Sequence, residues 1–179
     1  MPVNQAPHIH QNIICANVFI KKADKYLLMK RSSDKKFAPN YIHPFGGKLN
    51  TDENPYQGAI REIKEETNLC LKNIKLEAVV LEILPDTKIT KCNWLIFHFS
   101  ANYQSGQLKV NEEGEAVWLS ASQILSLDTK LFPSVRNLAK HILNPNDGVI
   151  FATFKYNPNS KPGQAKILKK YNQIDICAL

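Results

Sequence analysis

Three glutamates fall within five positions of the sequence, at residues 62, 65 and 66. A helix turns by about 100° per residue, so Glu62, Glu65 and Glu66 would share one arc of its surface. Carboxylates at this spacing suit Mg²⁺ or Mn²⁺, which prefer oxygen ligands, keep several waters and bridge to phosphate. Arg61 and Lys64 are expected to project elsewhere, which would leave the carboxylates in need of a cation. The alternative is a solvated helix face held by ordinary ion pairs.

Signals around the glutamates predict the helix that would hold them. Asn54 is a good N-cap, Pro55 suits the first helical position, and Gln57 stands where a capping box places its amide. Upstream, Gly46 and Gly47 allow close backbone approach or a positive φ. The apolar residues expected to share the core-facing arc are Ala59, Ile60 and Ile63.

Residues 47–69 resemble the Nudix box, G-x5-E-x7-R-E-U-x-E-E-x-G-U, in which U is aliphatic. Asn68 is the one departure, since it stands where the family has its second glycine. Asparagine tolerates the left-handed conformation that ends a helix, so the departure is expected to cost little. The run FGGK at residues 45–48 is also similar to that of oxidised-purine nucleoside triphosphate hydrolases. The matching box residues are Gly47, Glu53, Arg61, Glu62, Ile63, Glu65, Glu66 and Leu69.

This resemblance implies a mechanism as well as a fold. The fold would be of the α+β class, an α/β/α sandwich around a mixed β-sheet. The three box glutamates would hold Mg²⁺, or Mn²⁺, together with the carbonyl of Gly47, unless one of them, Glu62 by analogy, is instead the general base. Glu53 and Arg61 would form an ion pair that fixes the loop against the helix. The catalytic candidates are therefore Glu53, Arg61, Glu62 and Glu65.

The implied activity is hydrolysis of a nucleoside diphosphate linked to another group. Foremost is a nucleoside triphosphate cleaved to a monophosphate and pyrophosphate. ADP-ribose, a dinucleoside polyphosphate or an RNA 5′ end are alternatives. A non-catalytic nucleotide-binding module is an alternative of another class, although such a module would be expected to lose box carboxylates that this chain retains. The oligomeric state stays open.

Further candidates lie outside the box. Glu113 precedes Trp118 in a loop where relatives often carry one more acidic metal ligand, but a solvated acidic turn is the alternative. His98 shares a strand face with Trp94, so it could bond a substrate base or be a satisfied, half-buried histidine. His43 could line the cleft or stabilise a turn. The substrate-binding candidates are His43, Phe45, Lys48, His98 and Phe132.

Apolar alternation predicts a strand-rich chain with about two helices, which by itself indicates only an α+β fold. A hairpin with its turn at residues 21–25 and a strand pair around Pro85-Asp86 are the main strand signals. Residues 131–143 carry apolar side chains at helical spacing. The other predicted strands are residues 114–120, 148–156 and 165–179.

Composition sets the broad class. With 179 residues, 44% hydrophobic and 22% charged, the chain predicts one domain over residues 1–179, with residues 1–11 as a flexible tail. It has no apolar run near membrane-spanning length and no secretion signal. Its four cysteines, at positions 15, 70, 92 and 177, form no metal-binding spacing and are expected to be free thiols in the cytoplasm.

The C-terminal segment is basic. Residues 148–179 hold five lysines and one aspartate, which contribute +4 to the net charge of +7. Such a strand pair could attract polyphosphate, including RNA. No arginine cluster or aromatic stacking pattern accompanies it, so a strand edge protected by lysines is favoured over an RNA site.

Overall fold

The computed structural model describes residues 12–35, 38–83, 93–109, 113–127, 130–144, 148–156 and 165–171. The predicted tail at residues 1–11 and the Pro85-Asp86 turn lie outside these ranges. The strands are β1 (Asn12–Lys22), β2 (Lys25–Arg31), β3 (Ile42–His43), β4 (Phe45–Lys48), β5 (Cys70–Ile83), β6 (Asn93–Ser105), β7 (Gly114–Ser120), β8 (Ile150–Tyr156) and β9 (Ala165–Tyr171). The helices are α1 (Pro55–Thr67), α2 (Ala121–Ser126) and α3 (Pro133–Leu143).

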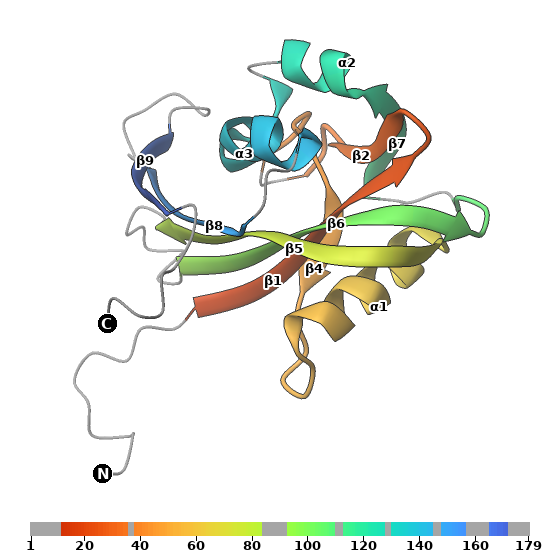
Figure 1. Ribbon diagram of the computed structural model, residues 1–179, viewed down its shortest axis with the longest axis horizontal. Coiled ribbons are helices and arrows are strands. Elements are labelled where there is room, and N and C mark those ends of the chain that lie inside the picture. The colour runs from red at the N-terminus through yellow and green to blue at the C-terminus, as the bar shows by residue number, and fades with distance from the viewer. Residues whose placement is uncertain are drawn as a thin grey trace.

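The described strands form one mixed sheet. Its order is β3-β2-β1-β6-β5-β8-β9, with β4 also paired to β1 and β7 to β2. The β1–β6 and β5–β8 pairs are parallel and the remaining pairs are antiparallel. Figure 1 shows α1 on one face of the central strands and α2 and α3 on the other. This arrangement confirms the predicted α/β/α sandwich.

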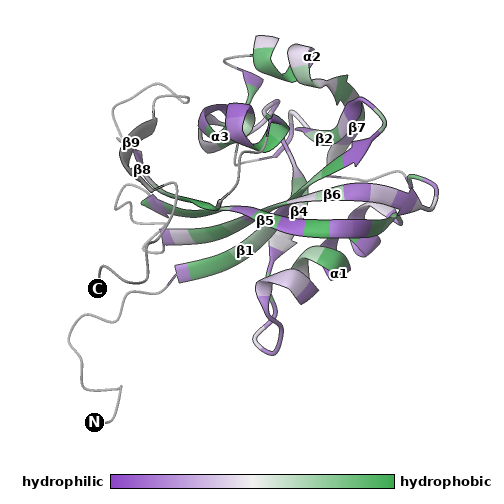
Figure 2. Ribbon diagram, in the orientation of Figure 1, coloured by the Kyte–Doolittle hydropathy of each residue, from purple (hydrophilic) through white to green (hydrophobic). Residues whose placement is uncertain are grey.

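The central strands are rich in hydrophobic residues, which Figure 2 colours green, and their buried side chains form one core on each face of the sheet. Along β1 the alternation of a strand sends Ala16 and Val18 into the core beneath α1. Cys15 and Phe19 point the other way, into the core beneath α3. Asn17 has the same parity as Cys15 and Phe19, so a polar side chain stands on the α3 face.

The predicted first hairpin is confirmed, but its two strands, β1 and β2, are paired only near the turn. The β1–β2 register joins Ile20 to Leu27 and Lys22 to Lys25. Beyond this short stretch β2 leaves β1, and the glycine-containing β4 pairs with the middle of β1 instead, with Gly47 opposite Ala16. The divergence of β2 from β1 leaves room between them on the α3 face.

The signals that predicted α1 act as expected. The Asn54 side chain accepts hydrogen bonds at 3.0 Å from the backbone N–H groups of Tyr56 and Gln57. The Gln57 side chain in turn accepts from the Asn54 N–H at 3.0 Å. Ala59 and Ile63 are fully buried, whereas Ile60 is 42% exposed. The prediction for Ile60 is wrong because it lies at the far edge of the apolar arc, about 60° beyond Ile63.

The described residues form three helices, whereas the sequence predicted about two; α2 is the additional one. Its signal was present as a second capping box, in which Ser120 accepts from the Gln123 N–H and the Gln123 side chain accepts from the Ser120 N–H. At the C-terminus, β8 and β9 pair antiparallel as the sequence indicated. In the sheet order β9 is an edge strand, the position expected for a lysine-rich segment.

Replacing Asn68 by glycine is expected to change little. Asn68 ends α1 at φ 60° in the left-handed conformation, as predicted, and glycine adopts that conformation more easily. The asparagine side chain, however, accepts a hydrogen bond from Lys64 Nζ at 2.9 Å in an exposed position. These effects oppose each other, so the free energy of unfolding should change by less than about 0.5 kcal/mol. Urea unfolding would measure it, and a large loss of turnover would reveal a side-chain role.

Candidate active site

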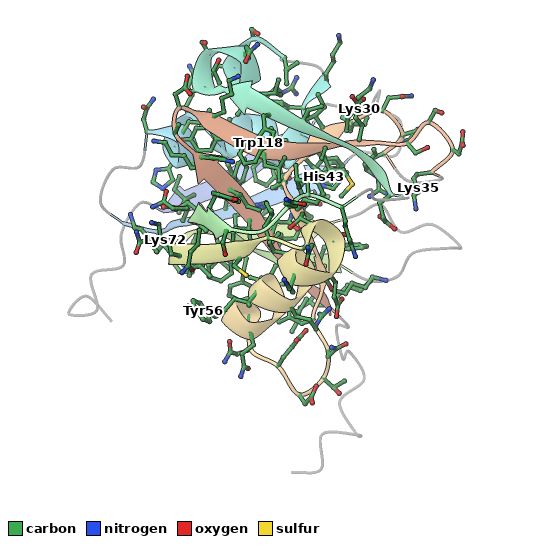
Figure 3. The ribbon with its side chains drawn as sticks, turned by 90° about the vertical axis from the view of Figure 1, so that its right-hand side faces the viewer. Lys30, Lys35, His43, Tyr56, Lys72 and Trp118 are labelled. Atoms are coloured by element: carbon green, nitrogen blue, oxygen red, sulfur yellow. The ribbon has the colours of Figure 1, made fainter. Side chains whose placement is uncertain are left out.

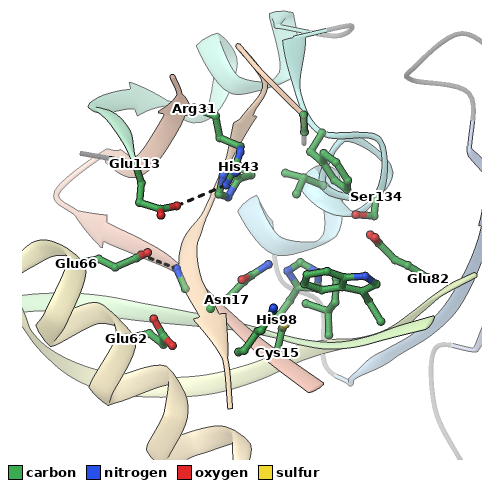
Figure 4. Close-up of a pocket in the computed structure, with 18 residues that line it drawn as sticks. Cys15, Asn17, Arg31, His43, Glu62, Glu66, Glu82, His98, Glu113 and Ser134 are labelled. Carbon is green, nitrogen blue, oxygen red and sulfur yellow. Dashed lines mark hydrogen bonds and ion pairs between the residues drawn. The ribbon is translucent and has the colours of Figure 1, made fainter. Parts of the chain in front are cut away.

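A cavity of about 530 Å³ lies on the α3 face of the sheet and extends past β4 to α1. In Figure 3, His43 lies inside the molecule beside this region, whereas Tyr56 projects outward from α1. Figure 4 shows Glu62, Glu66 and Glu113 at one end of the cavity, Glu82 and Ser134 at the other, and Asn17, His43 and His98 between them. We call the end with Glu62, Glu66 and Glu113 the acidic end.

Two glycines of β4 let the α1 carboxylates reach this cavity. Gly46 has φ 139°, and a Cβ there would collide with the carbonyl oxygen of Ala16. Its backbone N–H donates to Glu66 Oε2 at 3.1 Å. A Cβ on Gly47 would lie 2.6 Å from the carboxyl carbon of Glu62. Both positions therefore require glycine for the two carboxylates to approach the strand backbone.

Burial makes the acidic end unfavourable for negative charge. It raises the pKa of Glu66 to about 7, although the Gly46 N–H lowers that pKa in part, and the carboxylates of Glu62 and Glu113 raise it further. Burial also raises the pKa of Glu62, an effect that the neighbouring Arg61 opposes. Carboxylates crowded in a site of low polarity are more stable when a cation joins them.

Glu113 enters from the start of β7, on the opposite side of the cavity from α1. Its Oε1 accepts from Lys35 Nζ at 3.1 Å, and its Oε2 lies 3.8 Å from Arg31 Nη1. The side chain is 45% exposed, and it lines the same cavity as Glu62 and Glu66. The structure thus brings Glu113 to the box glutamates, while leaving it within reach of solvent.

The expectation that Arg61 projects away from the glutamates is wrong. Its Nη1 donates to Glu62 Oε1 at 2.9 Å and to Glu65 Oε2 at 3.0 Å. Its Nε donates to Glu53 Oε2 at 3.0 Å, and its Nη2 donates to the Lys48 carbonyl at 3.0 Å. Positions 61 and 65 are one turn apart, so a long guanidinium reaches both the helix acids and the loop.

Glu65 differs from its two neighbours. Its side chain is 59% exposed, against 15% for Glu62, and it does not line the cavity. Along the helix Glu65 lies about 60° further from the buried arc than Glu62, which accounts for its exposure. The structure therefore separates the three predicted carboxylates into two that line the cavity, Glu62 and Glu66, and one that lies outside it, Glu65.

Replacing Arg61 by glutamine is expected to lower both stability and activity. The guanidinium lowers the pKa of Glu53 to about 2 and holds the loop to α1, so its loss leaves partly buried carboxylates without their partner. We expect a lower Tm and a loss of roughly 10-fold or more in kcat/KM, because the loop positions the site. Lys64→Gln removes an exposed cation of the same helix and is the control. A normal Tm for Arg61→Gln would contradict the scaffold role.

The two histidine candidates both reach the cavity, and burial lowers the pKa of each to about 4. His43 Nδ1 donates to the Pro44 carbonyl at 2.7 Å, which leaves Nε2 as an acceptor without a partner among the described residues. His98 is 1% exposed, and neither of its ring nitrogens has a partner within the described part of the chain. His98 is thus neither half-buried nor satisfied, and both rings are neutral at physiological pH.

The other substrate-binding candidates divide between cavity and core. Lys48 and Phe132 line the cavity, with Lys48 Nζ 5.6 Å from the Trp94 ring centroid. Phe132 also contacts Tyr41, with ring centroids 5.9 Å apart in an edge-to-face arrangement. Phe45 is 1% exposed and belongs to the core beneath α1, not to the cavity lining. Its strand parity, opposite to that of Gly46, turns it away from the cavity.

Several lining residues were absent from the sequence-based candidates. They are Cys15, Asn17, Arg31, Glu82, Trp94 and Ser134. A polar residue at the core-facing parity of a strand was the available signal for Asn17 and Glu82, each flanked by apolar residues of the same parity. Cys15 lines the cavity, but burial raises the pKa of its thiol to about 12, which keeps it protonated.

The donor set at the acidic end fits a hard divalent cation. Glu62, Glu66 and Glu113 offer carboxylate oxygens, and Gly47 brings backbone next to Glu62 with no Cβ between. As they stand, no three acidic, histidine or cysteine side chains among the described residues are grouped closely enough to hold a metal ion. A cation would therefore draw these carboxylates together.

Comparison with known proteins places the chain in a family. The sequence model of the NUDIX domain matches residues 11–142, most of the chain. The chain belongs to the Nudix family. A curated Bacillus subtilis relative, the uncharacterised Nudix hydrolase YvcI, is 28% identical over 143 residues, which cover 79% of this chain and 85% of the relative. Members of the family generally use divalent metal cations.

Solved structures show the same fold. The MutT protein of Bacillus halodurans superposes with a TM-score of 0.71 at 23% identity, covering 89% of this chain and 96% of that one. The MutT protein of Methanosarcina mazei Go1 gives a TM-score of 0.62 at 24% identity, covering 77% of this chain and 97% of that one. These likenesses show the shared fold, and the family match makes the chain a Nudix hydrolase, an enzyme class that acts on nucleoside diphosphate-linked compounds. None of its described helices is long and apolar enough to cross a membrane.

Proposed function

We propose that this Nudix hydrolase is a Mg²⁺-dependent nucleoside triphosphate pyrophosphohydrolase that releases a nucleoside monophosphate and pyrophosphate. The observation that carries the proposal is the division of the cavity. Buried carboxylates gather at the acidic end, while neutral histidines and aromatic rings line the remainder. A cavity of about 530 Å³ is in the range that holds a nucleotide-sized ligand.

Glu66 and Glu113 would hold the cation, with the carbonyl of Gly47 as a further ligand, while Glu62 would stand beside it as the general base. Mn²⁺ would serve in place of Mg²⁺. Glu65 would join them only by releasing Arg61, to which it is now bonded at 3.0 Å. When bound, the cation supplies positive charge that offsets the anionic phosphate oxygens and makes a water molecule easier to deprotonate.

The chain's own residues would do the rest. Water attacks a phosphorus atom, the bond to the leaving pyrophosphate oxygen breaks, and Glu62 takes the proton of the water. Its burial favours that role because a carboxylate with a raised pKa binds a proton more readily. Arg61 holds one oxygen of Glu62 in place, and the ion pair of Arg61 with Glu53 fixes the loop before α1.

A product-resolved assay over a panel of substrates tests this proposal. Nucleoside triphosphates, ADP-ribose, a dinucleoside polyphosphate and 5′-capped RNA would be incubated with Mg²⁺, and products separated by chromatography. Equal amounts of monophosphate and pyrophosphate from a triphosphate would support the proposal. Release of inorganic phosphate, or preference for another member of the panel, would overturn it. No turnover of any substrate would favour the binding module.

We also propose that the chain forms one Nudix domain that works in the cytoplasm. Cys15 and Cys70 are free thiols, as a reducing compartment favours, and Cys92 and Cys177 lie outside the described residues. We favour a small nucleotide over RNA as substrate. The basic C-terminal strand pair ends in β9, the edge strand at the opposite end of the sheet from β3, and lysines at an edge strand have a structural explanation that needs no RNA.

A further inference from the structure

Glu82 is a buried carboxyl group that the proposed chemistry does not use. It lies on β5, is 3% exposed, and lines the cavity at the end opposite the acidic end (Figure 4). Its Oε1 atom has no hydrogen-bond partner of ordinary geometry among the described residues, although the hydroxyls of Ser134 and Tyr156 lie near the carboxyl group. Leaving a buried carboxyl oxygen unpaired is unfavourable, so a ligand with hydrogen-bond donors would gain by reaching it.

The surroundings of Glu82 suit a flat ring. Trp94 is its cross-strand partner on β6 and lines the same cavity. Ser134, in the first turn of α3, is 1% exposed, and its hydroxyl lies beside the Glu82 carboxyl. Phe132 also lines the cavity, with its ring centroid 6.4 Å from that of Tyr156. Aromatic walls with one buried polar group favour a heteroaromatic ligand.

A phosphate group does not suit this end of the cavity. The Glu82 carboxyl group offers a phosphate no positive charge, whereas Arg31 lies beside Glu113 at the acidic end. With the phosphates drawn toward a cation at the acidic end, the opposite end receives the base of the nucleotide. This orientation rests on the proposed function.

We propose that Glu82 selects the base of the substrate and that it favours guanine. Burial raises the pKa of Glu82, and guanine would offset this because its two neighbouring donors, the N1–H and the N2 amino group, favour the ionised carboxylate that accepts them together. Adenine and cytosine each place a ring-nitrogen acceptor beside their amino group, and uracil flanks its N–H with carbonyl oxygens. Each of these bases would set at least one lone pair against the Glu82 carboxylate, so the pairing rejects them.

Binding of GMP and AMP in the presence of Mg²⁺ tests the inference without turnover. Isothermal titration at neutral pH would compare the wild type with Glu82→Gln, which keeps the shape of the side chain but replaces one acceptor by a donor. Glu77→Gln is the matched control, because Glu77 is a fully buried glutamate of the same strand, bonded to Ser100 Oγ at 2.6 Å and outside the cavity lining. Tm would report folding, and Glu82→Asp, which retains charge but withdraws the carboxylate, serves if Glu82→Gln does not fold.

The wild type is expected to bind GMP roughly 10- to 100-fold more tightly than AMP. In Glu82→Gln that ratio should fall to near one through weaker GMP binding, while Glu77→Gln retains it. A wild type without preference, a ratio unchanged by both Glu82 variants, or an equal loss in Glu77→Gln would overturn the inference. Discrimination of GMP by a protein that cleaves no triphosphate would overturn the proposed function alone. Triphosphate cleavage without Glu82-dependent discrimination would overturn only the role of Glu82.

Discussion

Excess EDTA is expected to abolish cleavage of the substrate diphosphate bond, and added Mg²⁺ or Mn²⁺ is expected to restore it. Glu66 and Glu62 are largely buried and approach each other and Glu113 at the acidic end, where burial raises the pKa of both buried groups. A diphosphate brought to these carboxylates would meet negative charge, so only a bound cation makes its approach favourable.

Two controls make this prediction sharp. EDTA already saturated with Mg²⁺ should leave turnover unchanged, which separates chelation from other effects of the compound. Mg²⁺ should also raise the Tm of the protein without substrate, because a ligand that binds only the folded state stabilises it. The same Tm increase should be absent from Glu66→Gln. Undiminished turnover in excess chelator would contradict the metal-dependent reading of the site.

Local signals predicted the elements of the fold well. The capping residues Asn54 and Gln57 and the left-handed Asn68 each act within a few positions of the chain, so their roles are set by local hydrogen bonds and backbone conformation. The first hairpin was likewise predicted from its two apolar runs and the short polar turn between them. The helix α2 was missed because six residues carry too little periodicity to stand out.

Local sequence signals did not predict which residues from different strands and helices meet at the cavity. Phe45 and Gly46 are adjacent in sequence, yet one enters the core and the other meets Glu66, a difference decided by which strand β4 pairs with. Glu82 became visible as a site residue only when β5, β6 and α3 were placed around one cavity. Contacts between elements far apart in the chain produce no regular residue spacing in the sequence, so they could not be predicted from it.

The position of Arg61 shows the same limit. Helical geometry alone directs the Arg61 side chain away from the glutamate arc. The guanidinium is long and planar, so it nevertheless reaches Glu53, Glu62 and Glu65 at the same time. The repulsion that the sequence suggested among three unpaired carboxylates is thus relieved at two of them. Glu66 is the third; it accepts a hydrogen bond from the Gly46 N–H, and burial still raises its pKa to about 7.

Glu66→Gln and Glu62→Gln are each expected to lower kcat by roughly 100-fold or more, since the first removes a charge that would hold the cation and the second removes the general base. Glutamine keeps the size and helix propensity of glutamate, so the fold should survive. Glu65→Gln should have a smaller effect, because Glu65 is exposed and lies outside the cavity lining. Asp52→Asn, an exposed acid in the loop before α1, is the neutral control. Equal losses of kcat in the Glu62, Glu65 and Glu66 variants would instead support the sequence-based prediction that all three carboxylates hold the cation.

The stability of these variants without metal separates a site from a scaffold. Because the pKa of Glu66 is raised from 4.5 to about 7 in the folded protein, the folded state binds its proton more tightly, and this contribution to stability is lost as pH rises through that interval. Glu66→Gln carries no such titration, so its Tm should exceed that of the wild type increasingly between pH 5 and 8. Glu62→Gln should not share this gain, since it deprives Arg61 of one partner. If both variants kept near-normal kcat and melted below the wild type, the carboxylates would be structural, and nucleotide binding without turnover would become the better account of the protein.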